Sequence, residues 1–463
     1  MNIVLLSCYE QGQQSLNLAS PLAALRQAGF NVEAFDLAIQ KFPESSVAHS
    51  TLVAISTPMH TALRLAVSVA RQVRSLNSEA HICFYGSYAW MNRDLLLTEP
   101  TSGRRPVADS VIGGEFEQPL VRLATSLERG QSMSTASGVL TERSDVQPYL
   151  QRTRVPLPDR SSLPHLSQYA HLVLNGRQLA AGYTESSRGC LHLCRHCPVV
   201  PVYGGRFFVI SAETVLEDIR QQVESGAQHV TFGDPDFLNG PGHALKIARL
   251  LHRDHPSLTF DFTTKVEHII ENRPIMSELK DLGAAFVISA FESTSDRVLA
   301  RLHKGHTLAN MNQALEILDE AALPVQATWV PFTPWTSLDD YLHMLDWISS
   351  QGLIQHVAAV QLSIRLLVPP GSALLEHDDR DQWLGTLDRE GFGYRWQHDD
   401  PRMDALQRAI AALVERDGSR DPLDLFAEAE RLAYEAAGKV LPQTIEPAVT
   451  PAAPPRLTED WFC

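Results

Sequence analysis

The chain has 463 residues, with 39 Lys and Arg against 54 Asp and Glu, so its formal net charge is −15. Hydrophobic residues make up 44% and charged residues 20%, a composition typical of globular proteins that argues against wholesale disorder. The length suggests roughly two to four domains. The acidic balance disfavours a nucleic-acid partner bound through its phosphates, and six cysteines are too few for a disulfide scaffold.

The sequence indicates neither a targeting segment nor a membrane span. The N-terminus has no basic leader, and its apolar run is shorter than the roughly 7–15 residues of a secretory signal core. No stretch reaches the roughly 18 apolar residues that a membrane-spanning helix needs. We therefore expect a cytoplasmic protein, in a reducing compartment where free thiols persist and can bind metal.

The first 130 residues alternate between strand and helix patterns, which predicts parallel βαβ units in a doubly wound sheet. Strands are expected over residues 3–7, 32–37, 52–56, 82–85 and 110–112, and helices over 15–28, 62–76 and 117–126. Ligands of such sheets bind beyond the carboxyl ends of the strands. Those ends are residues 7–12, 57–60, 86–90 and 113–117.

Four further segments follow. Residues 131–180 are expected to be a linker and lead-in segment, and strand–helix alternation resumes over 181–375. Strands are expected there over 229–232, 258–263, 285–290, 325–330 and 357–367. Residues 376–440 are expected to be helical, over 379–389, 403–416 and 423–437. Residues 441–463 are rich in proline, which predicts a flexible tail.

Cys190, Cys194 and Cys197 are spaced as C-x3-C-x2-C. Three thiolates on one loop suit a soft metal ion or an iron–sulfur cluster. A structural zinc site usually has four protein ligands, so three favour a [4Fe–4S] cluster with one open iron. The alternatives are a zinc site completed by His192 or His196, or three unrelated cysteines.

The cysteine loop resembles that of the radical S-adenosylmethionine (radical SAM) superfamily, and other motifs extend the resemblance. Residues 231–237 are similar to a second-strand motif that holds the methionine amino group, which implies cofactor contacts from Asp234 and Asp236. Residues 288–299, followed by Lys304 and a glycine, are similar to a fourth-strand element, which implies that Glu292 and Ser293 lie near the cofactor. Residues 367–372 resemble the closing element. Residue 290 is Ala where the family more often has Gly, and residues 330–334 lack the family's fifth-strand glycines.

This resemblance implies a partial (βα)6 barrel after the doubly wound domain, followed by a helical C-terminal region. It implies that the three cysteines bind a [4Fe–4S] cluster whose open iron binds S-adenosylmethionine. An electron donor such as flavodoxin or ferredoxin would reduce the cluster, and the 5′-deoxyadenosyl radical formed would attack an unknown small-molecule or peptide substrate. Turn formation is the competing interpretation of Asp234 and Asp236, and a helix cap that of Glu292.

Residues 109–117 resemble the D-x-V-x-x-G-E-x-E element of cobalamin-binding domains, whereas the D-x-H-x-x-G loop of cobalamin methyltransferases is absent. Two alternatives stay open: a cobalamin-dependent radical methyltransferase, or a cobalamin-like fold without the cofactor. A methylthiotransferase would need a second cysteine triad, and only Cys8 and Cys83 stand in this domain, both in apolar strands. An alternative outside enzymes is a non-catalytic iron–sulfur or zinc-binding protein.

The chain ends on Cys463, after the proline-rich segment. This ending resembles a radical SAM subgroup whose C-terminus reads Cys-selenocysteine-Ala-Glu-Pro or Cys-Cys-Ala-Glu-Pro. A reading frame stopped at a selenocysteine codon would end on the preceding cysteine. The resemblance thus implies a selenoprotein with a reactive tail thiol at Cys463, and the alternative is a C-terminus without function.

Overall fold

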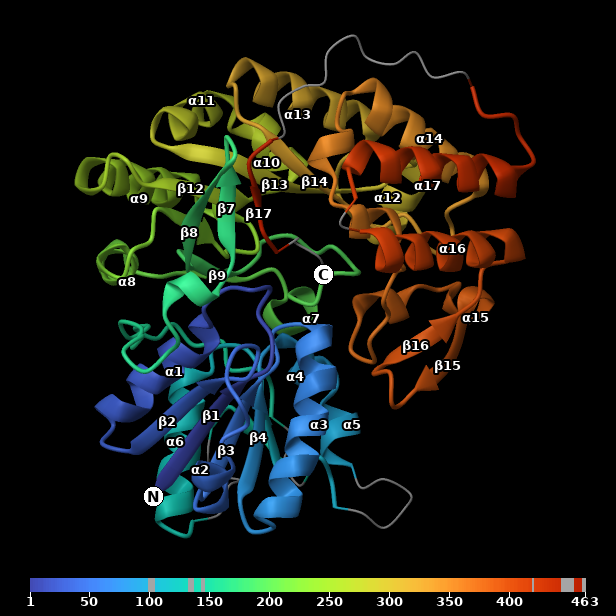
Figure 1. Ribbon diagram of the computed structural model, residues 1–463. Coiled ribbons are helices and arrows are strands. Elements are labelled where there is room, and N and C mark those ends of the chain that lie inside the picture. Colours follow the sequence, from blue (N-terminus) through green and yellow to red (C-terminus); the bar gives the residue numbers. More distant parts are fainter. Residues whose placement is uncertain (99–104, 132–136, 143–145, 419, 443–453, 460–463) are drawn as a thin grey trace.

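The computed structural model describes residues 1–98, 105–131, 137–142, 146–418, 420–442 and 454–459. Two sheets lie one above the other, and a helical region flanks the upper one (Figure 1). This is the expected fold class, a doubly wound domain followed by a partial barrel and C-terminal helices. Among the described helices, none is long and apolar enough to cross a membrane.

The described part of the N-terminal sheet has the strand order β2-β1-β3-β4-β5-β6. The first five strands in the sequence are parallel and β6 is antiparallel to β5. Their bounds are β1 Asn2–Ser7, β2 Asn31–Asp36, β3 Leu52–Ser56, β4 His81–Tyr85, β5 Ser110–Ile112 and β6 Val139–Leu140. The strands expected up to residue 112 form close to the expected bounds.

Helices cover both faces of this sheet, because alternate residues of each apolar strand point to opposite sides. Ile3 and Leu5 pack against α1 (Leu16–Gln27) and α6 (Glu117–Glu128). Val4 and Leu6 pack in the cluster that contains α3 (His60–Leu76). Shorter helices are α2 Glu44–Ala48, α4 Ser87–Met91 and α5 Arg93–Leu97.

The described barrel sheet has the order β14-β13-β12-β11-β8-β7-β17. The strands from β8 to β14 are parallel, whereas β7 and β17 are antiparallel to their neighbours. Their bounds are β7 His171–Leu174, β8 Arg177–Thr184, β11 His229–Phe232, β12 Thr259–Thr263, β13 Ala284–Glu292, β14 Val325–Trp329 and β17 Arg456–Leu457. The helices between them are α8 Ala212–Glu224, α9 Pro241–Asp254, α10 Val266–Glu271, α11 Arg273–Asp281, α12 Asp296–Leu302, α13 Leu308–Glu320 and α14 Leu338–Ser350.

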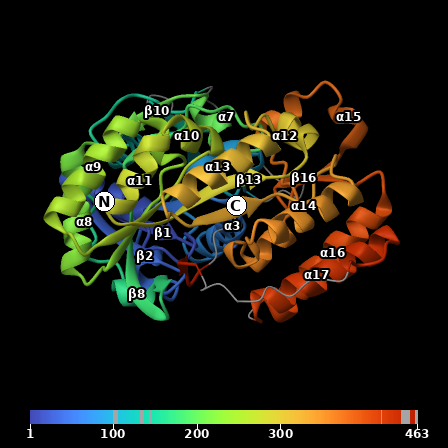
Figure 2. The ribbon, with the colours of Figure 1, turned by 90° about the horizontal axis from the view of Figure 1, so that it is seen from above.

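The prediction of a strand over residues 357–367 was wrong. The described structure has 3-10 turns there, Ile354–His356 and Ala359–Leu362, and keeps only a single parallel bridge between Phe332 and Arg365. The apolar run packs in one core with α16 (Pro401–Asp417) and α17 (Pro422–Ala437), and a short apolar run does not distinguish a strand from a buried helical turn. Figure 2 shows α16 and α17 side by side on one flank of the barrel, opposite α8 and α9.

The prediction of a helix over residues 379–389 was also wrong. One turn, α15 (Arg380–Trp383), leads into a hairpin of β15 (Leu384–Asp388) and β16 (Gly393–Trp396). The Asp388 carboxylate accepts the backbone N–H groups of Glu390 and Gly391, which favours the turn over a continued helix. Trp383 and Trp396 are buried in one cluster.

The prediction of a flexible tail over residues 441–463 was wrong for the described residues 454–459. β17 pairs with the edge strand β7, and the two lie beside each other in Figure 1. Leu457 packs in the cluster of Leu172, Phe286 and Ile288. An edge strand has unpaired backbone groups that an added strand can satisfy. We call residues 454–459 the strap.

Candidate cofactor site

A cavity of about 380 Å³ lies between the two sheets, a volume within the range of small-molecule sites. Its lower wall comes from the carboxyl ends of the N-terminal strands, where ligands were expected: Gln11, Pro58, Met59, Gly86, Ser87, Tyr88, Gly114 and Phe116. The barrel supplies Cys190, Cys194 and Cys197, and Leu457 and Glu459 of the strap complete the lining. The cavity is therefore built by three segments that are far apart in the sequence.

The cysteine loop runs from β9 (Ser187–Gly189) to α7 (Val200–Tyr203), and β9 pairs with β10 (Phe207–Val209). Gly189 has φ +78°, and a Cβ there would lie 2.4 Å from the carbonyl oxygen of Arg206. Only glycine accommodates this sharp turn. Cys190 and Cys194 are buried, and burial raises the pKa of the Cys190 thiol to about 11, so a bound metal would have to stabilise its thiolate.

Asp234 anchors the strand that enters the loop. Its carboxylate accepts hydrogen bonds from the Ser186 backbone N–H at 2.8 Å, the Ser186 hydroxyl at 2.7 Å and the Ser187 hydroxyl at 2.6 Å. Burial raises its pKa, whereas these donors lower it. Asp234 lines the cavity, but the hydrogen-bond donors to its carboxylate are Ser186 and Ser187. Its carboxylate therefore holds the strand that enters the cysteine loop.

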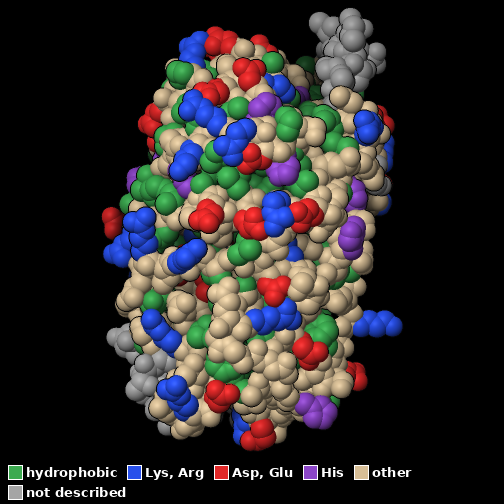
Figure 3. All heavy atoms as spheres, turned by 90° about the vertical axis from the view of Figure 1, so that its left-hand side faces the viewer, with side chains coloured by type: hydrophobic (Ala, Val, Ile, Leu, Met, Phe, Trp, Pro, Cys, Tyr) green, Lys and Arg blue, Asp and Glu red, His purple; other side chains and the backbone are tan. Residues whose placement is uncertain are grey.

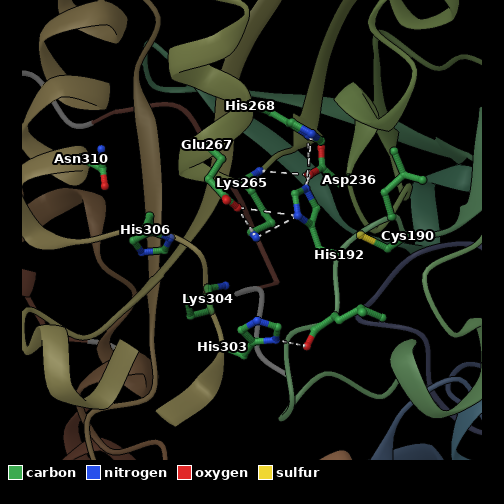
Figure 4. A network of polar contacts seen from close by, with 12 residues as sticks. Cys190, His192, Asp236, Lys265, Glu267, His268, His303, Lys304, His306 and Asn310 are labelled. Atoms are coloured by element: carbon green, nitrogen blue, oxygen red, sulfur yellow. Dashed lines mark hydrogen bonds and ion pairs between the residues drawn. The ribbon is translucent and has the colours of Figure 1, made fainter. Parts of the chain in front are cut away.

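Asp236 organises a second network, drawn in Figure 4. Its carboxylate accepts a hydrogen bond from Thr264 at 2.8 Å, and His268 Nδ1 and His192 Nε2 lie 2.9 and 3.7 Å from its Oδ2. Lys265 Nζ lies 3.0 Å from His192 Nδ1 and pairs with Glu267. This network connects the middle of the cysteine loop to the barrel.

His192, Asp236 and His268 have the composition of a metal site, and their ligand atoms lie within 4.8 Å of one another. The lysine argues against a second cation there. An imidazole that binds metal through Nε2 carries its proton on Nδ1, but His192 Nδ1 faces the Lys265 ammonium, which has only donors. Burial and Lys265 lower the pKa of His192 to about 4, so the neutral ring accepts the hydrogen bond from the lysine.

Glu292 and Lys304 form a buried ion pair on the other side of the loop. Glu292 has φ +65°, a backbone conformation uncommon outside glycine. Lys304 Nζ lies 3.2 Å and His196 Nε2 3.1 Å from its Oε1. Burial alone would raise the pKa of Glu292, but Lys304 and His196 outweigh it and hold the pKa at about 2. The Lys304 cation also lies within electrostatic range of Cys194 and Cys197, which raise its pKa further.

Residues 184–348 match the family model described as the Radical SAM superfamily. The chain contains a radical SAM domain.

The curated relatives of this chain include two methyltransferases by name. It is 22% identical over 329 residues to a hopanoid C-3 methylase of Methylococcus capsulatus, covering 70% of this chain and 62% of that protein. It is 24% identical over 259 residues to an uncharacterized methyltransferase of Pyrococcus horikoshii, covering 54% of each. The chain thus spans only 54–62% of the length of these relatives.

Two solved structures are similar to this chain in fold. The cobalamin-dependent S-adenosylmethionine radical enzyme OxsB, with aqua-cobalamin and S-adenosylmethionine bound, matches with a TM-score of 0.70 at 15% identity, over 94% of this chain and 71% of that chain. The methyltransferase TsrM from Kitasatospora setae, with cobalamin and a [4Fe–4S] cluster bound, matches with a TM-score of 0.59 at 15% identity, over 76% and 70%. At this identity the likeness establishes the fold.

The remaining candidate residues differ in whether they line the cavity. Among the described residues, Glu292 lines the cavity, whereas Asp236 and Ser293 are buried behind it. The Ser293 hydroxyl accepts the backbone N–H of Ser295, a turn contact. Cys8 and Cys83 are buried with pKa values raised to about 12, as expected of core thiols. Cys463 lies outside the described residues.

The sequence interpretation missed one buried charge next to the triad. Arg188 stands directly before Gly189 in a strand that is otherwise buried, and it contacts three carboxylates. Arginine is rarely buried unless it is paired, and the sequence does not show that this strand is buried, so the available signal was an arginine directly before the glycine of the loop.

Proposed function

We propose that this chain is a radical SAM enzyme that binds a [4Fe–4S] cluster through Cys190, Cys194 and Cys197 and reductively cleaves S-adenosylmethionine. The observation that carries the proposal is that all three cysteines line the cavity between the two sheets. A set of three thiolates leaves room for a further ligand on the metal, as a cofactor-binding cluster requires. The buried Lys304 cation offsets part of the negative charge that the thiolates would bring.

Cys190, Cys194 and Cys197 would hold the cluster, which would supply the electron for reductive cleavage of S-adenosylmethionine and so the radical chemistry on the substrate. The chain's own residues would hold the cysteine loop in place and orient the cofactor. Asp234 and Asp236 fix the cysteine loop, and Glu292 places an ionised carboxylate on the cavity wall. Both of its contacts reach Oε1, so Oε2 can accept a hydrogen bond from the cofactor's amino or ribose groups.

The electron must come from outside, so a flavodoxin or ferredoxin of the cytoplasm is the partner we expect. The substrate is a small molecule or a peptide that reaches the cavity. Figure 3 shows one outer face of the molecule, on the left in Figure 1, where basic and acidic side chains are interspersed rather than gathered into a single-sign patch.

Cobalamin-dependent radical methyl transfer is a second candidate function, and the lower wall of the cavity favours it. The carboxyl ends of the N-terminal strands face the cysteine loop across the cavity, where a second cofactor would lie between the two domains. The described lining residues from this domain offer amide and hydroxyl groups from Gln11, Gln13, Asn17, Ser87 and Tyr88, and no imidazole. These groups would hold a cobalamin by hydrogen bonds.

Anaerobic reconstitution with iron and sulfide tests the proposal. We expect about four irons per chain and 5′-deoxyadenosine from S-adenosylmethionine and dithionite. Cys194→Ala should lose both, whereas Cys83→Ala, a buried thiol of the N-terminal sheet, should keep both. A Cys194→Ala protein that still makes 5′-deoxyadenosine would overturn the site assignment. Zinc in place of iron would favour a non-catalytic protein, and corrin absorbance retained after added hydroxocobalamin would support methyl transfer.

A further inference from the structure

A buried cluster of charges joins the N-terminal domain to the strand that precedes the cysteine loop. Arg188 Nη1 donates to Glu117 Oε1 at 2.8 Å and to Glu115 Oε2 at 3.2 Å, and its Nε donates to Glu185 at 2.9 Å. Glu117 is the first residue of α6 in the N-terminal domain and Glu115 lies in the loop just before that helix, 71 and 73 residues from Arg188 in the sequence. The Arg188 guanidinium therefore joins the two domains.

This cluster is shielded from water. The Arg188 side chain is 7% exposed and those of Glu115 and Glu117 are 4% exposed. Other chain groups satisfy the carboxylates, since Ser20 donates to Glu117 at 2.5 Å and Tyr203 donates to Glu115 at 2.9 Å. Loss of one partner from such a buried set leaves an uncompensated charge, so the set holds its geometry tightly.

Glu115 contacts both ends of the cysteine loop. Arg188 lies two residues before Cys190, and Tyr203 ends the short helix α7 that follows Cys197. Gly189, between Arg188 and Cys190, is locked in its turn against the Arg206 carbonyl. A shift of the N-terminal domain at Glu115 would therefore move Cys190 and α7 together.

We propose that Glu115 and Glu117 are positioning residues that set the cysteine loop from the N-terminal domain, through Arg188 and Tyr203. The G-E-x-E segment of this chain then acts on the radical chemistry through the loop rather than by touching a cofactor. The N-terminal domain becomes part of the geometry of the cluster site whether or not it binds a cofactor itself. This inference rests on the proposed function for its catalytic consequence, and on the contacts alone for its structural one.

The double variant Glu115→Gln/Glu117→Gln removes both charges with little change in shape, and Arg188→Lys keeps the charge but loses the fork of donors. The matched control is Arg160→Gln. Arg160 is also 7% exposed and also joins the domains, through Asp218 and Gln14, but none of its described contacts is to residues 187–203. All three changes should lower the melting temperature, so the melting temperature alone does not decide.

Two further measurements test the proposal: amide hydrogen exchange, and the spectrum and turnover of the reconstituted protein. In the protein without added iron, amide hydrogen exchange should lose protection over residues 190–203 in the double variant and in Arg188→Lys, but not in Arg160→Gln. After reconstitution to equal iron content, the first two should show an altered electron paramagnetic resonance spectrum with S-adenosylmethionine and a roughly hundredfold lower kcat for its cleavage. If both readouts match those of Arg160→Gln, the inference is overturned. If the wild-type chain binds no iron and cleaves nothing, the proposed function fails, and the exchange result still tests the contact.

Discussion

Lys304 Nζ lies 3.2 Å from Glu292 Oε1, and both side chains are buried beside the cysteine loop. Lys304→Met should lower the free energy of unfolding by about 3–5 kcal/mol, because it leaves the Glu292 carboxylate buried without its cation. Chemical denaturation at pH 7 measures this. The double variant Lys304→Met/Glu292→Gln should recover much of the loss, and equal losses in the single and double variants would contradict the pairing.

The turn at Gly189 gives a second prediction. Gly189→Ala should disrupt the cysteine loop and reduce the iron bound on reconstitution, because its Cβ would lie 2.4 Å from the Arg206 carbonyl oxygen. Gly204→Ala is the matched control, since that residue also has positive φ, +55°, but no atom lies within 4 Å of its added Cβ. It should cost only about 1–2 kcal/mol of stability and keep the iron. Equal iron in both variants would argue against the close approach at Gly189.

Glu10 predicts a pH dependence in the N-terminal domain. Burial outweighs the hydrogen bonds from Ser15, Asn17 and Ser7 and raises the pKa of Glu10 from 4.5 to about 7. Below pH 4.5 the carboxyl is protonated in both the folded and the unfolded state. As the pH rises from 4.5 to 7, only the unfolded state ionises freely, so the folded state loses up to about 3 kcal/mol of stability.

Glu10→Gln should remove this loss. Its free energy of unfolding, relative to the wild-type chain, should therefore rise by up to about 3 kcal/mol between pH 4.5 and pH 7.5. Denaturant titrations at several pH values measure the difference. Glu33→Gln, an exposed glutamate on β2, is the control and should show no such trend. A flat difference for Glu10→Gln would mean that Glu10 is not held protonated in the folded chain.

The strap predicts a local change on truncation. The Thr458 backbone N–H donates to the His171 carbonyl at 2.8 Å, and the His171 N–H donates to the Thr458 hydroxyl at 2.9 Å. A chain that ends at residue 453 should lose amide-exchange protection at His171 in β7. A chain that ends at Glu459 keeps the strap and should retain the protection. Unchanged exchange in the shorter chain would show that the strap does not protect the edge of the barrel.

The N-terminal strands could be predicted from the sequence because each is a short apolar run between turn residues, such as 3–7 and 52–56. The apolar run at 357–362 has the same appearance, but it packs against α16 and α17, and that outcome depends on tertiary contacts. The hairpin after Trp383 was missed because its charged residues suit a surface helix equally well.

The site could be predicted only as far as its local motifs reach. The spacing of Cys190, Cys194 and Cys197 was readable because all three share one loop. The contact of Arg188 with Glu115 and Glu117 could not be predicted from the sequence, because it pairs residues more than 70 positions apart in two domains. Its parts were both visible in the sequence, the G-E-x-E segment and the arginine before Gly189, but a single sequence does not show that they meet.

The strap also has a consequence for how the protein is made. Domains fold largely as they leave the ribosome, the N-terminal ones first. Leu457 and Glu459, which line the cavity, are synthesised after all the other strands of both sheets, and the Tyr9 hydroxyl can donate to Glu459, at 2.6 Å, only once the strap has emerged. Until then the nascent chain carries both domains with one wall of the cavity missing. Insertion of the proposed cluster and cofactor thus has a period, before the strap is synthesised, in which the strap cannot obstruct it.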